Sequence, residues 1–167
     1  GQSQINIGML DGNDVLEVVG GVNNFANGNI GDDRITIKGG LGRYLGGSQN
    51  DVLSVEAAEA GSWVNGNKDN DVITGNVDGV VYRGGSENDT LIVGAGTVWG
   101  DKGADTFRAV AGSGVAVVQD YTPGLDFVEG VSGGSFSAAD GGISYGVGGD
   151  EMLLLLGISD SSQVSLI

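Results

Sequence analysis

Six aspartates recur at nearly constant spacing in the first two thirds of the chain, and together they could bind cations. Each of them ends a loop rich in glycine and polar residues, and successive ones are 16 to 20 residues apart. A coil built of two short strands and two turns takes about 18 residues. The spacing therefore predicts one anchor aspartate per coil, stacked in a row. The anchors are Asp14, Asp33, Asp51, Asp71, Asp89 and Asp105.

The chemistry that such a row would support is calcium binding. The six loops, from Met9–Asp14 to Gly100–Asp105, hold 11 of the 22 acidic residues. Carboxylates one strand spacing apart repel by on the order of 1 kcal/mol even in water. Ca²⁺ fits better than Mg²⁺, because it accepts about six to eight oxygens in flexible geometry. Six loops leave at most five positions between coils, so we expect several Ca²⁺ ions, at most five. Further candidate ligands in the loops are Asp11, Asp32, Asp69 and Asp101.

The residues after each anchor alternate in character, which predicts the strands that position the row. Ile35 and Ile37 fall on one face, with Thr36 between them, and other repeats follow the same pattern. This period of two is typical of a β-strand. The chain also contains 34 glycines, and each would cost a helix about 1 kcal/mol relative to alanine.

A second strand is predicted midway between successive loops, and each coil places one aromatic residue in it. Stacked at about 4.8 Å per coil, these residues could form a ladder, some facing inward and others outward. We interpret them as filling the sheet, with a sugar-stacking platform as the alternative. They are Phe25, Tyr44, Trp63, Tyr82 and Trp99.

This pattern resembles the repeats-in-toxin (RTX) family, whose glycine- and aspartate-rich nonapeptides bind Ca²⁺ in the turns of a parallel β-roll. The resemblance covers roughly residues 9–109, and the segments 103–107, 117–126 and 152–158 look like the end of such a roll. It implies that the sixth loop position, the anchor aspartate, binds metal. The sequence departs from the pattern at the fourth position, where three loops replace glycine with Gln49, Asp69 and Glu87. Beyond the repeats, Asp120 or Asp126 could hold an extra ion.

The expected architecture is all-β: a right-handed parallel β-roll, or β-solenoid, of about six coils over residues 1–110, with a β-rich cap over residues 111–167. The cap should end the roll, because an open strand edge invites pairing. The first strand, around Gln4–Ile7, carries no proline or charge that would protect it. We therefore expect more protein upstream or a second copy of the chain at this end.

Composition narrows the function classes. The chain has no histidine and no cysteine, so it holds no catalytic triad built on histidine and no thiol or zinc chemistry. A net charge of −15 argues against nucleic acid as a partner. No apolar run is long enough to insert in a membrane. We therefore expect a protein that is not an enzyme.

Two functions remain from this reasoning. The first is a secreted, calcium-binding structural protein of a bacterial surface or extracellular matrix, which folds and self-assembles on Ca²⁺ binding. The resemblance implies type I secretion, and the hydroxyl-rich tail 159–167 suits its C-terminal signal. The alternative is a C-terminal module of a larger secreted enzyme or adhesin, as in alginate epimerases or RTX proteases, that aids secretion, folding or polysaccharide binding. The arginines are few and fall at different phases of the repeat, which weakens the polysaccharide version: Arg34, Arg43, Arg83 and Arg108.

Overall fold

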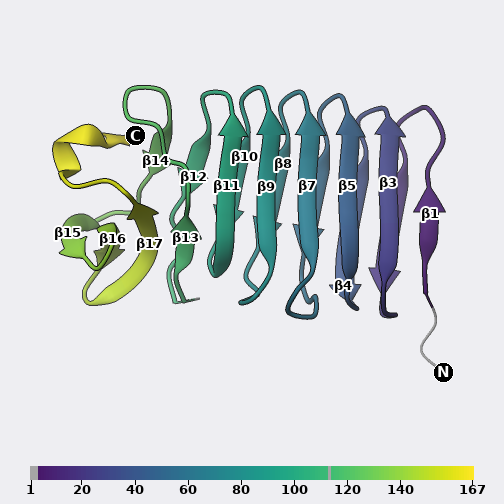
Figure 1. The fold of residues 1–167 in the computed structure, drawn as a ribbon, viewed down its shortest axis with the longest axis horizontal. Helices are drawn as coiled ribbons and strands as arrows, with labels where there is room; N and C mark the ends of the chain where they lie inside the picture. Colours follow the sequence, from purple (N-terminus) through teal and green to yellow (C-terminus); the bar gives the residue numbers. More distant parts are fainter. Residues whose placement is uncertain (1–3, 113) are drawn as a thin grey trace.

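The structure, a computed structural model, describes residues 4–112 and 114–167. The chain winds into a parallel β-solenoid of about seven coils with a repeat of about 18 residues, one coil more than the sequence predicts. Figure 1 shows the coils stacked side by side along the long axis, with the N-terminus at one end and the C-terminal strands at the other. The all-β, parallel fold class is confirmed.

Two sheets face each other, and each coil gives one strand to each sheet. The ten-stranded sheet has the order β1-β3-β5-β7-β9-β11-β13-β17-β16-β15. Its strands are β1 (Asn6–Gly8), β3 (Asn24–Ile30), β5 (Gly42–Ser48), β7 (Trp63–Lys68), β9 (Val81–Ser86), β11 (Gly96–Lys102), β13 (Ala116–Val118), β15 (Ser135–Ala139), β16 (Gly142–Val147) and β17 (Asp150–Leu156).

The eight-stranded sheet lies opposite and has the order β18-β14-β12-β10-β8-β6-β4-β2. All of its neighbouring strands run parallel, as the crossover from coil to coil requires. Its strands are β2 (Val15–Val19), β4 (Arg34–Gly39), β6 (Val52–Val55), β8 (Val72–Gly75), β10 (Thr90–Val93), β12 (Thr106–Arg108), β14 (Phe127–Glu129) and β18 (Ser165–Leu166).

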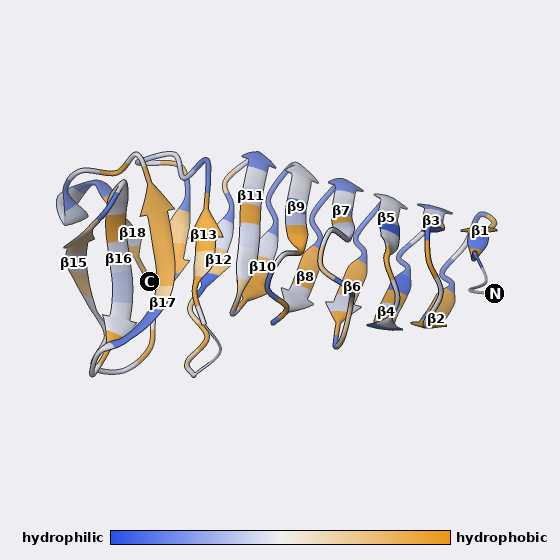
Figure 2. Cartoon of the chain, turned by 60° about the horizontal axis from the view of Figure 1, so that its bottom comes forward, coloured by the Kyte–Doolittle hydropathy of each residue, from blue (hydrophilic) through white to orange (hydrophobic). Residues whose placement is uncertain are grey.

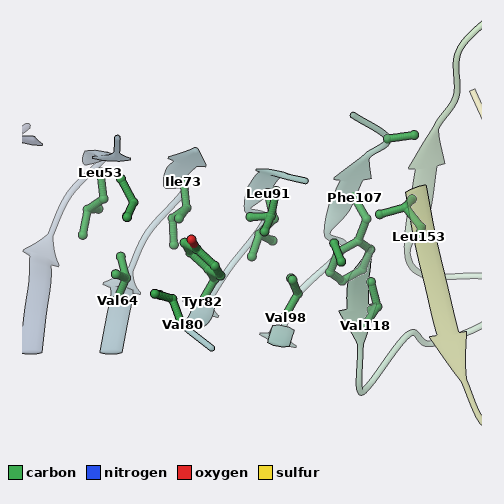
Figure 3. Close-up of a cluster of buried hydrophobic side chains, with 14 of the residues drawn as sticks. Leu53, Val64, Ile73, Val80, Tyr82, Leu91, Val98, Phe107, Val118 and Leu153 are labelled. Carbon is green, nitrogen blue, oxygen red and sulfur yellow. The ribbon is translucent and has the colours of Figure 1, made fainter. Parts of the chain in front are cut away.

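The core is the narrow layer between the two sheets. In Figure 3, Leu53, Ile73 and Leu91 of the eight-stranded sheet face Val64 and other side chains of the ten-stranded sheet. All three are at most 1% exposed, while the residues directly before and after each of them on its strand are partly exposed. The alternation predicted from the sequence is therefore confirmed, and it fixes which residues each strand presents to the interior.

The C-terminal segment continues both sheets and then closes one of them. Strands β13 and β14 extend the sheets past residue 110 by parallel pairing with β11 and β12. Strand β17 pairs parallel with β13 and antiparallel with β16, so the hairpin β15–β16 covers the end of the ten-stranded sheet. A 3-10 turn, Ser161–Gln163, precedes β18. In the described part of the chain, no helix is long and apolar enough to cross a membrane.

Polar and apolar segments separate along each coil. Figure 2 shows the turns at one edge of the solenoid in hydrophilic colours, with apolar residues concentrated along the strands. The anchor aspartates lie at this polar edge, each just before a strand of the eight-stranded sheet. The coil geometry therefore gathers them in one row, as their spacing predicts.

Candidate functional site

The anchor aspartates form a continuous hydrogen-bonded ladder along the polar edge. The backbone N–H of each anchor donates to the Oδ1 atom of the anchor in the next coil. The donor–acceptor distances are 2.8 Å for Asp14 to Asp33, Asp33 to Asp51, Asp51 to Asp71 and Asp71 to Asp89, and 2.9 Å for Asp89 to Asp105. All six predicted anchors are therefore brought together in register. We refer to this row as the aspartate ladder.

The ladder lies inside the protein and leaves part of each carboxylate without a partner. The anchors from Asp33 to Asp105 are at most 2% exposed, and only Asp14 at the open end is half-buried. Among the described residues, four buried carboxylate oxygens have no hydrogen-bond partner: Oδ2 of Asp33, Asp51, Asp71 and Asp89. Because an unsatisfied buried acceptor costs about 1–3 kcal/mol, and more when charged, these oxygens call for a proton or a cation.

A glycine five residues before each buried anchor makes room for its carboxylate. A Cβ atom on Gly84 would lie 2.3 Å from Asp89 Oδ2 and 2.8 Å from the carbonyl oxygen of Gly100 in the next coil. The same holds at Gly28, where Asp33 Oδ2 and the Gly46 carbonyl oxygen are both 2.2 Å away. The unpartnered oxygens of Asp33, Asp51 and Asp89 therefore each share a small space with a backbone carbonyl of the neighbouring coil.

Burial makes the ladder costly to ionise. It is the largest cause that raises the pKa of Asp51 to about 7, of Asp71 and Asp89 to about 8, and of Asp105 to about 6. The neighbouring carboxylates add to the rise, while the backbone N–H donors oppose it. Without a nearby positive charge, burial therefore favours the protonated form of Asp71 and Asp89 at neutral pH.

The ladder has a seventh rung that the repeat spacing does not reveal. Asp126 accepts the Asp105 N–H at 3.0 Å through Oδ1, and its Oδ2 accepts the Thr122 N–H at 2.8 Å. The loop before it contains Pro123-Gly124 in place of the glycine-rich pattern and makes the spacing 21 residues. The sequence indicated Asp126 only as a residue that could hold an extra ion, and the alternating strand after it was the signal for a further rung. Asp120 lies outside this ladder, where its two oxygens accept the N–H groups of Gly100 and Asp101.

A second ladder runs along the exposed side of the same loops, one residue before the anchors. Its side-chain oxygens accept backbone N–H groups at 2.8–3.0 Å, and its members are Asn13, Asp32, Asn50, Asn70 and Asn88. Sequence reasoning missed it, because only the acidic residues of the loops were considered. The second ladder holds the coils in register independently of any ion.

The other predicted ligands lie outside the aspartate ladder. Asp32 belongs to the second ladder, and the Asp69 carboxylate accepts the Gln49 N–H at 2.9 Å. Glu87 in turn accepts the Asp69 N–H at 2.9 Å. Asp101 pairs with Arg83, and Asp11 is exposed. Among the described residues, none of these side chains joins the anchors in a group of three or more acidic residues that could hold a metal ion.

The residue types of the aspartate ladder fit a hard cation. Buried carboxylate oxygens and backbone carbonyls are the ligands that Ca²⁺ takes in proteins. Within the described residues, no three or more acidic side chains are arranged to hold a metal ion by themselves. A cation at this edge would therefore depend on the unpartnered Oδ2 atoms together with backbone carbonyl oxygens.

The predicted aromatic row divides between the two sides of its sheet. Tyr44 and Tyr82 are fully buried, while Phe25, Trp63 and Trp99 lie on the outer face. The buried pair fills the interior, as the sheet-filling interpretation predicts. The mixed orientation also agrees with the expectation that some of these rings face inward and others outward.

The arginines are less scattered than the sequence suggests. The Arg43 guanidinium carbon lies 5.2 Å from the centre of the Trp63 ring, and that of Arg83 lies 5.4 Å from Trp63 and 5.2 Å from Trp99. These four residues therefore form one cation–π stack on the outer face of the ten-stranded sheet. Arg43 and Arg83 do occupy different positions of the repeat, because Arg43 pairs with Trp63 and Arg83 pairs with Asn65. They nevertheless lie on the same outer face, because positions two residues apart on a strand share a face.

Comparison with known proteins adds no family to this description. The chain matches no family model, and no curated protein matches it. The parallel solenoid and its row of aligned aspartates are compatible with an RTX-like β-roll.

Proposed function

We propose that the protein is a calcium-binding β-roll of the RTX type, in which Ca²⁺ ions stabilise the stacked coils. The observation that carries this proposal is the row of buried Oδ2 atoms without hydrogen-bond partners on Asp33, Asp51, Asp71 and Asp89. A row of carboxylates in this environment holds either protons or metal ions. Ca²⁺ supplies two charges at each position and accepts carbonyl oxygens in the same shell, which a proton cannot do.

The proposed mechanism couples ion binding to folding. In the absence of calcium, the net charge of −15 and the cost of burying the ladder oppose stacking of the coils. Each bound ion adds RT ln(1 + [Ca²⁺]/Kd), which is about 2.7 kcal/mol at a hundredfold excess over Kd. Each ion would stabilise the contact between two neighbouring coils, so several ions would stabilise successive contacts along the solenoid.

A calcium titration followed by calorimetry and circular dichroism tests the proposal. We expect heat from several binding events and a rise in sheet content or melting temperature as Ca²⁺ is added. Mg²⁺ at the same concentration should have a smaller effect, because it demands a tighter octahedral shell. The same melting temperature in excess chelator and in excess Ca²⁺ would exclude the proposal.

In its biological setting, we propose that the protein is secreted and has a structural, non-enzymatic role at a bacterial surface or in an extracellular matrix. The alternative is that the solenoid serves as the C-terminal module of a larger secreted enzyme or adhesin. The length of the natural chain separates the two, and intact-mass measurement of the secreted protein gives it. Fusion of residues 111–167 to a reporter tests whether the cap region directs type I secretion.

Self-association through the first coil belongs to the same proposal. Strands β1 and β2 are the outer strands of their sheets, and large apolar side chains near them are exposed. Leu10 is 82% exposed, Val15 79% and Val19 70%. A second copy that pairs with these strands would cover both the edges and the side chains. Sedimentation velocity tests this, and a protein that stays monomeric at high concentration in Ca²⁺ would contradict it.

A further inference from the structure

The outer face of the eight-stranded sheet carries mainly β-branched and hydroxyl side chains. Because residues two apart on a strand share a face, the outward residues form two rows that cross the strands in register. The first row consists of Val15, Arg34, Val52, Val72, Thr90, Thr106 and Phe127. The second row consists of Glu17, Thr36, Ser54, Thr74, Ile92, Arg108 and Glu129. All of these residues are exposed or partly exposed, and we call the surface that they form the Val/Thr face.

The charges on the Val/Thr face nearly cancel, although the chain as a whole carries −15. Glu17 pairs with Lys38 of β4, and Glu129 pairs with Arg108, each at 2.7 Å. Among the described residues, Arg34 takes part in no ion pair and is left as a free cation. Together with Lys38, the face therefore has three cations and two acids, a net charge of +1. Two copies can approach through this face without bringing unpaired carboxylates together.

The two ends of the Val/Thr face are complementary in charge. A two-fold axis parallel to the strands, between β8 and β10, would bring two such faces together with the N-terminal end of one over the C-terminal end of the other. The free Arg34 of β4 would then lie over β14, where Phe127 can stack on its guanidinium and Glu129 can pair with it. An axis along the solenoid would instead place Arg34 beside Arg34 of the second copy. Charge therefore favours the axis parallel to the strands.

The same arrangement covers large apolar side chains that are exposed at both ends of the sheet. On β2, Val15 is 79% exposed and Val19 70%. Ile167, which follows β18, is 65% exposed. Because β2 of one copy would lie over β18 of the other, the apolar side chains of each end would be removed from water by the opposite end.

The size of the face is sufficient for a specific dimer. Its eight strands, with about four residues each, span roughly 38 by 13 Å at the usual spacings. Two copies would therefore bury about 1,000 Å² in total, which is close to the minimum for a specific interface. At the centre, β8 would lie over β10, and the side chains that meet there are uncharged: Val72, Thr74, Thr90 and Ile92.

We propose that two copies of the protein form a symmetric dimer by packing their Val/Thr faces against each other. A second copy is favoured over an unrelated partner, because both halves of the contact, the free arginine and its acceptor, are present on one chain. This interface differs from end-to-end association through the first coil, which pairs strand edges and leaves the centre of the outer face free. The dimer requires the folded solenoid, and the proposal does not rest on calcium binding.

Sedimentation velocity over a range of protein concentrations tests the proposal, at one fixed concentration of free Ca²⁺ and on protein shown to be folded by circular dichroism. We expect the wild type to form dimers, and V72K to raise the dimer Kd by about tenfold or more, because it buries a lysine at the centre of the contact. The matched control V81K changes a partly exposed valine on β9 of the ten-stranded sheet and should dimerise like the wild type. Both variants change the net charge equally, so general repulsion does not distinguish them.

Cross-linking identifies the face directly. The chain has no cysteine, so T74C and T97C each introduce a single thiol, on β8 and on β11 of the other sheet. Facing sheets pack about 10 Å apart, and position 74 lies close to the two-fold axis. A short bismaleimide should therefore join two T74C chains efficiently and two T97C chains only at the background rate.

Three results would overturn the proposal. They are a folded wild type that stays monomeric at high concentration, an equal dimer Kd in V72K and V81K, and equal cross-linking of T74C and T97C. Association that V72K leaves unchanged would come from another interface, such as the strand edges of the first coil. None of these results bears on the aspartate ladder, whose test is the calcium dependence of folding.

Discussion

The substitution Asp89→Asn should have opposite effects with and without calcium. Asp89 is 1% exposed, its Oδ1 accepts the Asp71 N–H at 2.8 Å, and its Oδ2 has no partner. Asparagine has nearly the same size and retains the acceptor oxygen. It places an uncharged donor in the space that the unpartnered oxygen shares with the Gly100 carbonyl. The change therefore removes one buried charge and one carboxylate ligand, with little effect on packing.

The pKa of Asp89 sets the size of the effect in chelator. Burial raises this pKa to about 8, against roughly 4 in an unfolded chain. Each pKa unit corresponds to about 1.4 kcal/mol. Because Asp89 is ionised in the unfolded chain at pH 7 and must take up a proton on folding, its burial lowers the free energy of unfolding by up to roughly 4 kcal/mol. Because neighbouring carboxylates share this cost, we expect the variant to gain about 2 kcal/mol. In a domain of this size, that is a rise in Tm of about 4–8 °C.

In excess Ca²⁺ the sign should reverse. The variant would then lack a ligand to an ion, and the loss of one site at a hundredfold excess removes about 2.7 kcal/mol. Thermal melts of both proteins, in chelator and in Ca²⁺ at pH 7, measure the four values. A variant that is more stable by the same amount in both buffers would refute calcium binding at this rung. A variant less stable in chelator would refute the reasoning from buried charge. Asp140→Asn serves as the control, since Asp140 is exposed and lies in the turn between β15 and β16.

Four further results are expected. In chelator, the free energy of unfolding should fall as pH rises from about 4 to 8, because the raised pKa values of the anchors make the folded protein hold protons that the unfolded chain releases; urea titrations at pH 5 and pH 8 measure this, and stability that rises over the interval contradicts it. Gly84→Ala should destabilise by about 3 kcal/mol or more, because its Cβ would lie 2.3 Å from a carboxylate oxygen, while Gly20→Ala, with open space around it, should be nearly neutral in the same melts. Asn70→Ala should cost about 1 kcal/mol in chelator and in Ca²⁺ alike, since it removes a rung of the second ladder at 2.9 Å; a loss seen only in Ca²⁺ would instead place Asn70 at an ion. Tyr145→Phe should cost about 1–3 kcal/mol in urea titrations, because the buried hydroxyl bonds both the N–H and the carbonyl of Val131, at 2.9 and 3.1 Å, and an unchanged midpoint would show that these bonds add nothing.

The spacing of the anchors was sufficient to predict the solenoid and its aspartate ladder. Both depend on local rules, because a two-residue strand period and a turn every half coil place each anchor above the last. Asp126 was predicted only as a possible extra ligand and not as a rung of the ladder, because a 21-residue step with a proline-containing turn replaces the glycine-rich loop. A rung lies just before a strand of the eight-stranded sheet. For Asp126 this strand is β14, and it could be assigned to that sheet only from its pairing with β12.

The outer face of the ten-stranded sheet was not predictable in the same way. Whether Arg83 and Trp99 share a face depends on where β9 and β11 start relative to one another, and the turns before them differ in length. One residue of slip moves a side chain to the other side of a sheet. The stack of Trp63 between two arginines therefore became visible only with the register of the strands.

The hydrogen bonds of Asp126 make the C-terminal end of the aspartate ladder different from its N-terminal end. Its own loop holds this carboxylate through the Thr122 N–H, so Asp126 does not need an anchor of a following coil to position it. Each earlier anchor donates its N–H to the rung that follows and depends on that rung for order. Successive coils are only about 18 residues apart, so each docking step closes a short loop at a small entropic cost. We expect the C-terminal end to act as a template from which folding spreads toward the N-terminus. The number of coils could then change at the N-terminal end, one whole repeat at a time, without rebuilding the template.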